Sequence, residues 1–201
     1  KGGEPIQLTD GLSRSSSCPR LSPDGKQLSF VYRASIFDLF VVNMDGTGLT
    51  NLTNNGKDSL EGFCANWSPD GSQIVFDSAI EETPNDWFTQ IYSANADGSG
   101  ITQLTANNNE KDDHHNPVWS PDGQKIAFIS DVFGQDVYVM NADGSDLTLF
   151  GDIEELVKDF HWSPDGTKIV FACHRGLDSI GEGVCIMNSD GSGSLTLTDD
   201  S

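Results

Sequence analysis

Bulky apolar residues alternate with polar ones in short runs along the chain, and turn-forming residues separate the runs. One set of runs follows the tetrapeptide Ser-Pro-Asp-Gly, with paired apolar positions at Leu28/Phe30, Ile74/Phe76, Ile126/Phe128 and Ile169/Phe171. A period of two is typical of a strand packed on one face. A second set, at 39–43, 91–95, 137–141 and 184–188, is rich in β-branched and aromatic residues, which strands prefer. No convincing helical period appears, so the sequence predicts an all-β protein.

The turn motifs recur four times and divide the chain into repeats. Ser-Pro-Asp-Gly occurs at 22–25, 68–71, 120–123 and 163–166, and Trp precedes three of these copies. An Asp-Gly pair ends each second run, at Asp45, Asp97, Asp143 and Asp190. Asp-Gly favours a tight hairpin because Gly tolerates the positive φ that the turn requires. A short segment then closes each repeat, ending in Leu-Thr in three copies and Leu-Phe in the other.

Each repeat therefore holds four antiparallel strands in roughly 45 residues, the size of one propeller blade. A single blade cannot bury both faces, whereas blades stacked around an axis bury them against one another. We expect a β-propeller of four four-stranded antiparallel blades, or a segment of a larger propeller. The predicted division is an outer-strand tail at 1–10 and blades at 18–53, 64–105, 116–150 and 159–199.

The tail raises a question about how the ring closes. Residues 5–10 align with the outer-strand segment 194–199, so the chain has four sets of inner strands and five outer-strand segments. The chain is then a slice of a larger propeller, or its tail displaces the last outer strand, or the surplus strand pairs with another molecule. The third reading follows because an unpaired strand is a template for β-addition, and it predicts head-to-tail oligomers or filaments. The chain opens Lys1-Gly2-Gly3, so we expect a processed chain or part of a longer one.

The charge and composition of the chain limit the classes of partner that we expect. The formal net charge is −20, and so acidic a surface repels phosphate backbones, which argues against nucleic acid. No run approaches the ~20 apolar residues of a membrane helix, so we expect no membrane insertion. The sequence has no Gly-x-Ser-x-Gly, His-Glu-x-x-His or phosphate-loop motif, so it shows no strong catalytic constellation.

One copy of the repeat carries a family resemblance. Trp-Ser-Pro-Asp-Gly, then Ile-Ala-Phe, then Val-Tyr-Val-Met-Asn-Ala-Asp-Gly-Ser run intact from Trp119 to Ser145. This pattern resembles the TolB-type (WD-like) propeller repeat, and the resemblance covers nearly the whole chain. It implies the fold and leaves the function open, because similar blades occur in periplasmic TolB, in the propellers of prolyl-oligopeptidase-like proteases and in oligogalacturonate lyases.

The innermost strands are expected to line a central channel. If the Trp before each Ser-Pro-Asp-Gly packs between blades, the residue two before it does so too: Pro19, Ala65, Pro117 and Phe160. The intervening positions would then face the channel as two rings. One ring is Arg20, Asn66, Val118 and His161, and the other is Cys18, Cys64, Asn116 and Asp159. A polar binding site and a plugged structural channel are both open readings of these rings.

Four cysteines fall into two spatial pairs. Cys18 and Cys64 occupy one position in adjacent blades, and Cys173 and Cys185 fall on adjacent strands of the last blade. Two disulfides and an oxidising compartment follow if these pairs are bonded, and four buried free thiols are the alternative.

Three further candidates involve turns and loops. Asn141, Asp143 and Asp146 form the most carboxylate-rich of the Asn-x-Asp-Gly turns, and their oxygens could ligate Ca²⁺ or could serve turn geometry alone. His114 and His115 are expected in a solvated loop near the channel mouth, although a transition-metal or acid–base role is the alternative. Asn51 begins an Asn-Leu-Thr sequon on an outer strand, where glycosylation is a hypothesis.

These observations favour a secreted or periplasmic binding or scaffold module that contacts proteins or self-assembles, with no cofactor except the hypothetical calcium. The alternative is a polysaccharide lyase or hydrolase that uses His161, Arg20 and Asp159 at the channel. A wide channel with a bound metal would favour the enzyme.

Overall fold

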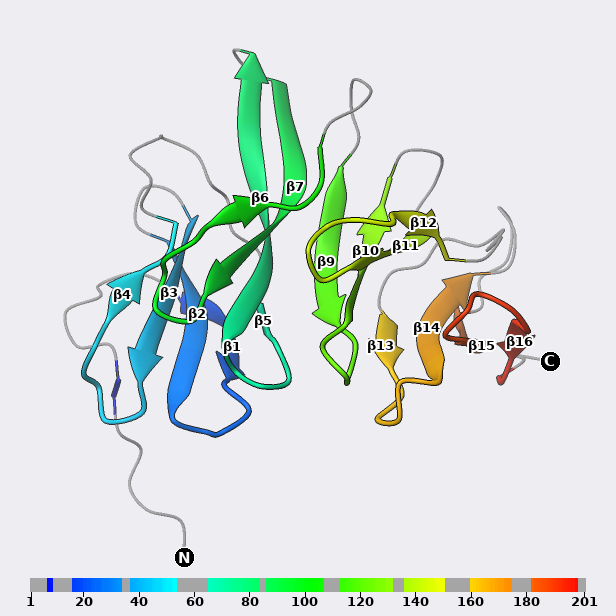
Figure 1. Ribbon diagram of the computed structural model, residues 1–201, viewed down its shortest axis with the longest axis horizontal. Coiled ribbons are helices and arrows are strands. Elements are labelled where there is room, and N and C mark those ends of the chain that lie inside the picture. The colour runs from blue at the N-terminus through cyan, green and yellow to red at the C-terminus, as the bar shows by residue number, and fades with distance from the viewer. Residues whose placement is uncertain are drawn as a thin grey trace, which may run out of the picture.

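Four antiparallel sheets of four strands each make up the part of the protein that the structure describes. The computed structural model describes residues 7–8, 16–33, 37–53, 65–83, 86–106, 113–131, 136–150, 160–174 and 182–198. The sheets lie next to one another in chain order across the molecule (Figure 1). No helix occurs in these ranges, so the prediction of an all-β fold with four four-stranded blades is confirmed.

Each blade uses its strands in chain order, from the innermost to the outermost. Blade 1 contains β1 (Ser16–Leu21), β2 (Gln27–Arg33), β3 (Phe37–Asn43) and β4 (Thr50–Asn51). Blade 2 contains β5 (Asn66–Trp67), β6 (Gln73–Thr83), β7 (Asp86–Asn95) and β8 (Thr102–Gln103). Blade 3 contains β9 (His114–Trp119), β10 (Lys125–Ser130), β11 (Asp136–Asn141) and β12 (Thr148–Leu149). Blade 4 contains β13 (Phe160–Trp162), β14 (Lys168–His174), β15 (Glu182–Asn188) and β16 (Leu195–Thr196).

The Ser-Pro-Asp-Gly motif forms the hairpin between the first two strands of every blade. In blade 1, the Gly25 amide donates to the Ser22 carbonyl at 2.9 Å. The Ser22 hydroxyl donates to Asp24 Oδ1 at 2.7 Å and accepts from the Gln27 amide at 2.9 Å. Gly25 has a φ of +70°, which only Gly adopts without strain. The motif therefore satisfies its own polar groups, and this explains its recurrence.

Adjacent turns also touch along one edge of the molecule. A Cβ placed on the turn Gly of one blade would lie 3.5–3.6 Å from the Pro ring of the preceding turn, for the pairs Gly71/Pro23, Gly123/Pro69 and Gly166/Pro121. This is ordinary van der Waals contact, so successive turns are spaced about one methyl group apart.

The Thr of the Leu-Thr ending forms a hydrogen bond from the end of the outer-strand segment to the third strand of the blade. The Thr53 hydroxyl accepts the Leu39 amide at 3.0 Å. The same bond joins Ile91 to Thr105 and Val184 to Thr198, each at 2.9 Å. A side-chain oxygen thus takes the backbone donor that would otherwise have no partner beyond the two-residue outer strand.

The core lies between blades. We call the side of a blade that meets the next blade its forward face, and the opposite side its backward face. The forward face of blade 1 (Val31, Leu39, Val41, Leu52) packs on the backward face of blade 2 (Ala65, Trp67, Ile74, Phe76, Ala94). The same pattern joins blade 2 to blade 3 and blade 3 to blade 4. A paired ring stack reinforces the backward faces of blades 1 to 3, namely Phe30–Phe40, Phe76–Tyr92 and Phe128–Tyr138.

Two features depart from the repeat. The hairpin of β6 and β7 is the longest in the protein as described, and it projects beyond the neighbouring blades (Figure 1). In the tail, only Gln7 and Leu8 are described, and Leu8 packs on the backward face of blade 1 beside Phe30, Tyr32 and Val42. The Leu8 carbonyl faces Gly46 as the Leu104 carbonyl faces Gly144. Leu8 therefore occupies the place of an outer strand belonging to a blade before blade 1.

Truncation of one interblade ring should test this core. Phe128 is fully buried between blades 2 and 3, and we expect Phe128→Ala to lower the free energy of unfolding by about 3–5 kcal/mol. Leu149→Ala, at a residue 45% exposed on β12, is the control and should change it by less than about 1 kcal/mol. Urea denaturation followed by fluorescence measures both, and equal effects would contradict the assignment of the core.

Candidate functional site

The innermost strands carry the residues predicted to line a channel. Arg20 and His161 are exposed, whereas Asn66 and Val118 are half-buried. The strands are linked across blades, because Asn66 Nδ2 donates to the Pro117 carbonyl at 2.8 Å and Trp67 Nε1 donates to the Arg20 carbonyl at 3.1 Å. Asp159 lies outside the described residues. The role of this ring in lining a channel stays a prediction.

The residues two before the Trp position follow the expectation in three blades of four. Ala65 and Phe160 are each 1% exposed between blades, and Pro117 is also buried. Pro19 is exposed, so the prediction was wrong for blade 1. The physical reason is that none of the four described blades covers the backward face of β1, where Leu21 is also 57% exposed.

A bulge shapes the second predicted ring. Cys18 and Asn116 occupy the same place in β1 and β9, where the register shifts, and their φ angles are +52° and +54°. Asn tolerates this left-handed conformation, whereas it is uncommon for Cys. The two residues thus share a bulge geometry that turns the inner strand, as β-bulges do elsewhere.

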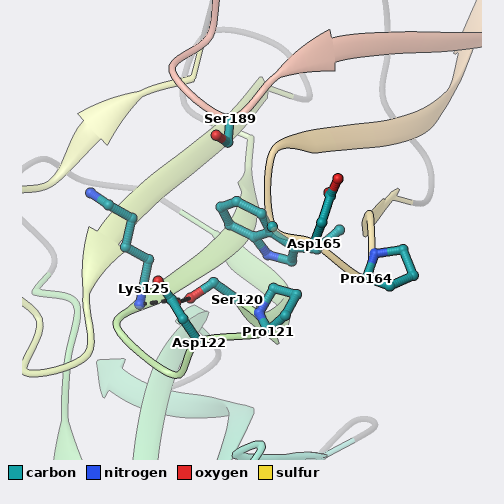
Figure 2. A pocket seen from close by; sticks show the side chains of 9 residues that line it. Ser120, Pro121, Asp122, Lys125, Pro164, Asp165 and Ser189 are labelled. Atoms are coloured by element: carbon teal, nitrogen blue, oxygen red, sulfur yellow. Dashed lines mark hydrogen bonds between the residues drawn. The ribbon is translucent and has the colours of Figure 1, made fainter.

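A cavity of about 340 Å³ lies between the Ser-Pro-Asp-Gly turns of blades 3 and 4. Figure 2 shows Ser120 and Asp122 from one turn, Lys125 at the start of β10 and Asp165 from the next turn around this cavity. Both carboxylates are engaged within their own turns, since each accepts a hydroxyl hydrogen bond of 2.6 Å from Ser120 or Ser163. The cavity thus offers a polar rim without a catalytic constellation.

The calcium candidate is held together by turn hydrogen bonds. Asp143 Oδ1 accepts both the amide and the hydroxyl of Ser145, at 3.0 and 2.6 Å, and Asn141 Nδ2 donates to Asp146 Oδ2 at 2.8 Å. Equivalent bonds form at Asp45, Asp97 and Asp190. In the ranges that the structure describes, no group of three or more His, Cys, Asp or Glu side chains could hold a metal. Calcium binding stays a prediction, and the bonds present support the turn.

The cysteines lie as the strand assignment anticipated. In the register of β14 and β15, Cys173 is opposite Gly183 and Cys185 is opposite Phe171, so the two cysteines are diagonal neighbours. Among the described cysteines none is free. Cys64 lies outside the described residues. The pairings Cys18–Cys64 and Cys173–Cys185 remain predictions.

The histidine pair is not in a loop, which corrects the prediction. His114 begins β9 and pairs with Ser130 of β10, because the inner strand continues past its bulge. His114 is 5% exposed, with its ring edge-on to Phe128 at 5.2 Å. His115 Nε2 lies 3.4 Å from Asp131 Oδ1. The side chains point apart, as expected for neighbours on a strand.

Asn51, the predicted glycosylation site, lies on β4, and its Oδ1 accepts the Thr53 amide at 3.0 Å. Its modification stays a prediction.

The forward face of blade 4 is more exposed to solvent than the forward faces of blades 1 to 3. Val184 is 39% exposed, whereas the equivalent residues Leu39, Ile91 and Val137 are at most 1% exposed. Leu197 is 53% exposed, against 2% for Leu52 and 5% for Phe150. Val170, Ala172 and Ile186 complete this face and are only partly buried. This exposure could not be predicted from the sequence, because these residues match the buried pattern of the other blades.

Comparison with known proteins identifies the fold. A putative TolB from Agrobacterium tumefaciens superimposes with a TM-score of 0.72 and 24% identity, over 89% of this chain and 63% of that protein. An oligogalacturonate lyase in complex with manganese superimposes with a TM-score of 0.75 and 17% identity, over 96% of this chain and 55% of the lyase. The fold is that of a TolB-type β-propeller.

Sequence relatives share only part of their length with this propeller. The uncharacterized peptidase YuxL of Bacillus subtilis (strain 168) is 30% identical over 123 residues, which are 60% of this chain and 18% of the peptidase. The Tol-Pal system protein TolB of Alcanivorax borkumensis is 30% identical over 88 residues, 43% of this chain and 20% of the relative. The chain thus matches about a fifth of these relatives. No protein-family model matches the sequence. The described part of the chain has no helix long and apolar enough to cross a membrane.

The turn carboxylates should make the propeller sensitive to acid. Hydrogen bonds from turn hydroxyls and amides lower the pKa of Asp24, Asp70 and Asp165 to about 2 and also lower those of Asp45, Asp97, Asp122, Asp143 and Asp190. Since the folded pKa is depressed, this stabilisation is present above about pH 4 and is lost as pH falls towards 2. We expect Asp70→Asn to reduce the loss of stability over that interval in urea titrations. Asp131→Asn, outside the turns, is the control and should leave it unchanged.

Peptide mapping under non-reducing conditions should find two linked peptide pairs, Cys18 with Cys64 and Cys173 with Cys185. Disulfides of this kind constrain the unfolded chain, so reduction should also lower the midpoint of urea denaturation. If iodoacetamide labelled all four cysteines of the denatured, unreduced protein, the pairing would be wrong.

Proposed function

We propose that this propeller is a protein-binding scaffold that self-assembles through the forward face of blade 4. The observation that supports the proposal is the exposure of Val184 and Leu197 at positions that are buried by the next blade elsewhere in the chain. Burying such a face removes apolar area from water at about 25 cal/mol per Å². An apolar face of this kind marks an interaction site in a soluble protein.

The junctions within the chain indicate what kind of surface would cover the exposed forward face of blade 4. Three junctions within the chain cover a forward face with the backward face of a blade, in which large apolar residues such as Ile74 and Phe76 interdigitate with Leu39 and Val41. The partner should therefore present a blade-like backward face. Blade 1 has such a face in Leu28, Phe30 and Val42, of which Phe30 and Val42 are at most 2% exposed and pack with Leu8. We therefore propose a second copy of this chain as the partner, with the tail leaving this face when the copies meet.

The tail would take part in this contact. Leu8 stands where the outer strand of a preceding blade would stand, whereas blade 4 already carries β16 as its own outer strand. When blade 4 of one copy approaches blade 1 of another, the tail and β16 compete for one position. Exchange of the tail for β16 would resolve the competition through backbone hydrogen bonds, as in β-strand addition.

A periplasmic location is part of the proposal. It is supported by the likeness to TolB proteins and by cysteines that are not free, since disulfides persist in oxidising compartments. Secretion to the exterior would satisfy the same chemistry. A polysaccharide lyase or hydrolase at the channel is the alternative, supported by the likeness to an oligogalacturonate lyase. Conversion of oligogalacturonate by the purified chain would establish that alternative.

Light scattering coupled to gel filtration tests self-assembly. The 201-residue chain, of 21.7 kDa, should elute as a dimer or a larger species, and Val184→Asp should shift it to the monomer because a charge would be buried at the contact. Leu149→Asp places the same charge on an equally exposed apolar residue away from that face and should leave the mass unchanged. A wild-type monomer across micromolar concentrations would overturn the proposal.

A further inference from the structure

Asp77 is a buried carboxyl group at an otherwise apolar junction. It lies on β6 and is 1% exposed, opposite Ile91 in the register of β6 and β7. Among the residues that the structure describes, none donates a hydrogen bond to either carboxylate oxygen. A buried ionised carboxylate without hydrogen bonds is costly, so this group requires an explanation.

The repeat shows that the position does not need a carboxyl group. The residues equivalent to Asp77 are Val31, Ile129 and Ala172, which are opposite Leu39, Val137 and Val184 in their own blades. In each of the other blades an apolar side chain therefore fills this place on the forward face. Blade 2 alone carries a titratable group there, so the carboxyl group is a property of one junction rather than of the fold.

The surroundings of Asp77 are defined by the cluster between blades 2 and 3. Val75 and Ile91 flank Asp77 on the forward face of blade 2, and they pack against Phe128 of blade 3. The Phe128 ring contacts His114, which pairs with Ser130. Strands β6 and β9 are in direct contact. Asp77 therefore faces the same interface as His114 and Ser130.

The charged and titratable groups around Asp77 are few. From β9, His114 faces the junction, and Asp113 precedes it with its Oδ1 engaged by the Thr89 amide at 2.8 Å. The described side chains of β5 are Asn66 and Trp67, which do not titrate, and Tyr92 of β7 stacks on Phe76 on the opposite face of the blade. His114 is thus the one described group of opposite charge, when protonated, that faces this junction.

We propose that Asp77 makes the junction between blades 2 and 3 a pH-responsive joint, which is closed while the carboxyl group is protonated and loosens when it ionises. The joint goes beyond the scaffold function and does not depend on it. The other junctions lack the titratable group and should stay closed over the same pH range.

The direction of the response follows from burial. Desolvation raises the pKa of Asp77 from its ordinary value near 3.8 to about 7. Because the folded state holds this proton more tightly than the unfolded chain, its contribution to stability is complete below about pH 4 and declines as pH rises towards 7. The response is therefore opposite in sign to that of the turn carboxylates and falls in a different pH range.

Urea denaturation of the wild type and of Asp77→Asn at pH 5 and pH 8 gives the first test. The unfolding equilibrium constant of the wild type relative to the variant should rise about a hundredfold between these pH values, as a folded pKa near 7 requires. Asp45→Asn removes an exposed turn carboxylate whose pKa is lowered by hydrogen bonds from Thr47; it serves as the control and should give no such difference, because this group is ionised at both pH values. If the variant were less stable than the wild type at both pH values, an ion pair with His114 would account for the group and the proposal would be overturned.

Hydrogen exchange measured by mass spectrometry locates the effect. In the wild type, raising the pH from 5 to 8 should reduce the protection of β6 and β9, after correction for intrinsic exchange, more than that of β2 and β14. Asp77→Val, which installs the residue of blade 1, should abolish the local change and also serves if the Asn variant folds poorly. Equal loss of protection in all blades would overturn the joint. The measurement in a Val184→Asp background separates this outcome from any failure of self-assembly.

Discussion

The packing of one blade's forward face on the next blade's backward face is the constraint on which the propeller depends. A sheet of four short strands has two apolar sides and cannot bury either alone. Each junction supplies the missing half, with branched residues such as Leu39 and Val41 set against Ile74 and Phe76. The ladder hydrogen bonds between strands lie within one blade, whereas the apolar faces of the blade are buried by its neighbours. The packing between blades therefore governs the stability of the propeller.

The polar motifs that recur in the sequence serve a different purpose. Ser22 and Asp24 close a hairpin, and Thr53 takes a backbone amide of Leu39. Their recurrence reflects a local requirement that each blade meets in the same way. A residue that breaks the pattern at a buried position, such as Asp77, is more informative about function than residues that repeat it, because the fold alone does not require it.

The sequence was sufficient to predict the blades, because turn motifs and alternating runs are local signals. It was also sufficient to align Leu8 with the outer strands, since the tail has the same Leu-Thr ending. It misplaced His114, because the strand pairing of β9 beyond its bulge depends on a partner strand rather than on local composition. The substitution of Asp77 for Val, Ile or Ala was visible in the aligned repeats, but its burial followed only from the packing of two blades. The exposure of Val184 could not be predicted, because burial at this position depends on whether another surface packs against blade 4, and no local pattern indicates that.

The contacts between successive Pro and Gly turns have a mechanical consequence. The turns at Pro69 and Gly123, and at Pro121 and Gly166, lie within a methyl group of each other along one rim. That rim has little room for compression. Relative motion of two blades would therefore be a hinge rotation about this rim, with most displacement at the opposite rim. Strands β6 and β7 extend away from that rim (Figure 1), so a small angular change at the junction would displace the described ends of these two strands more than the turns.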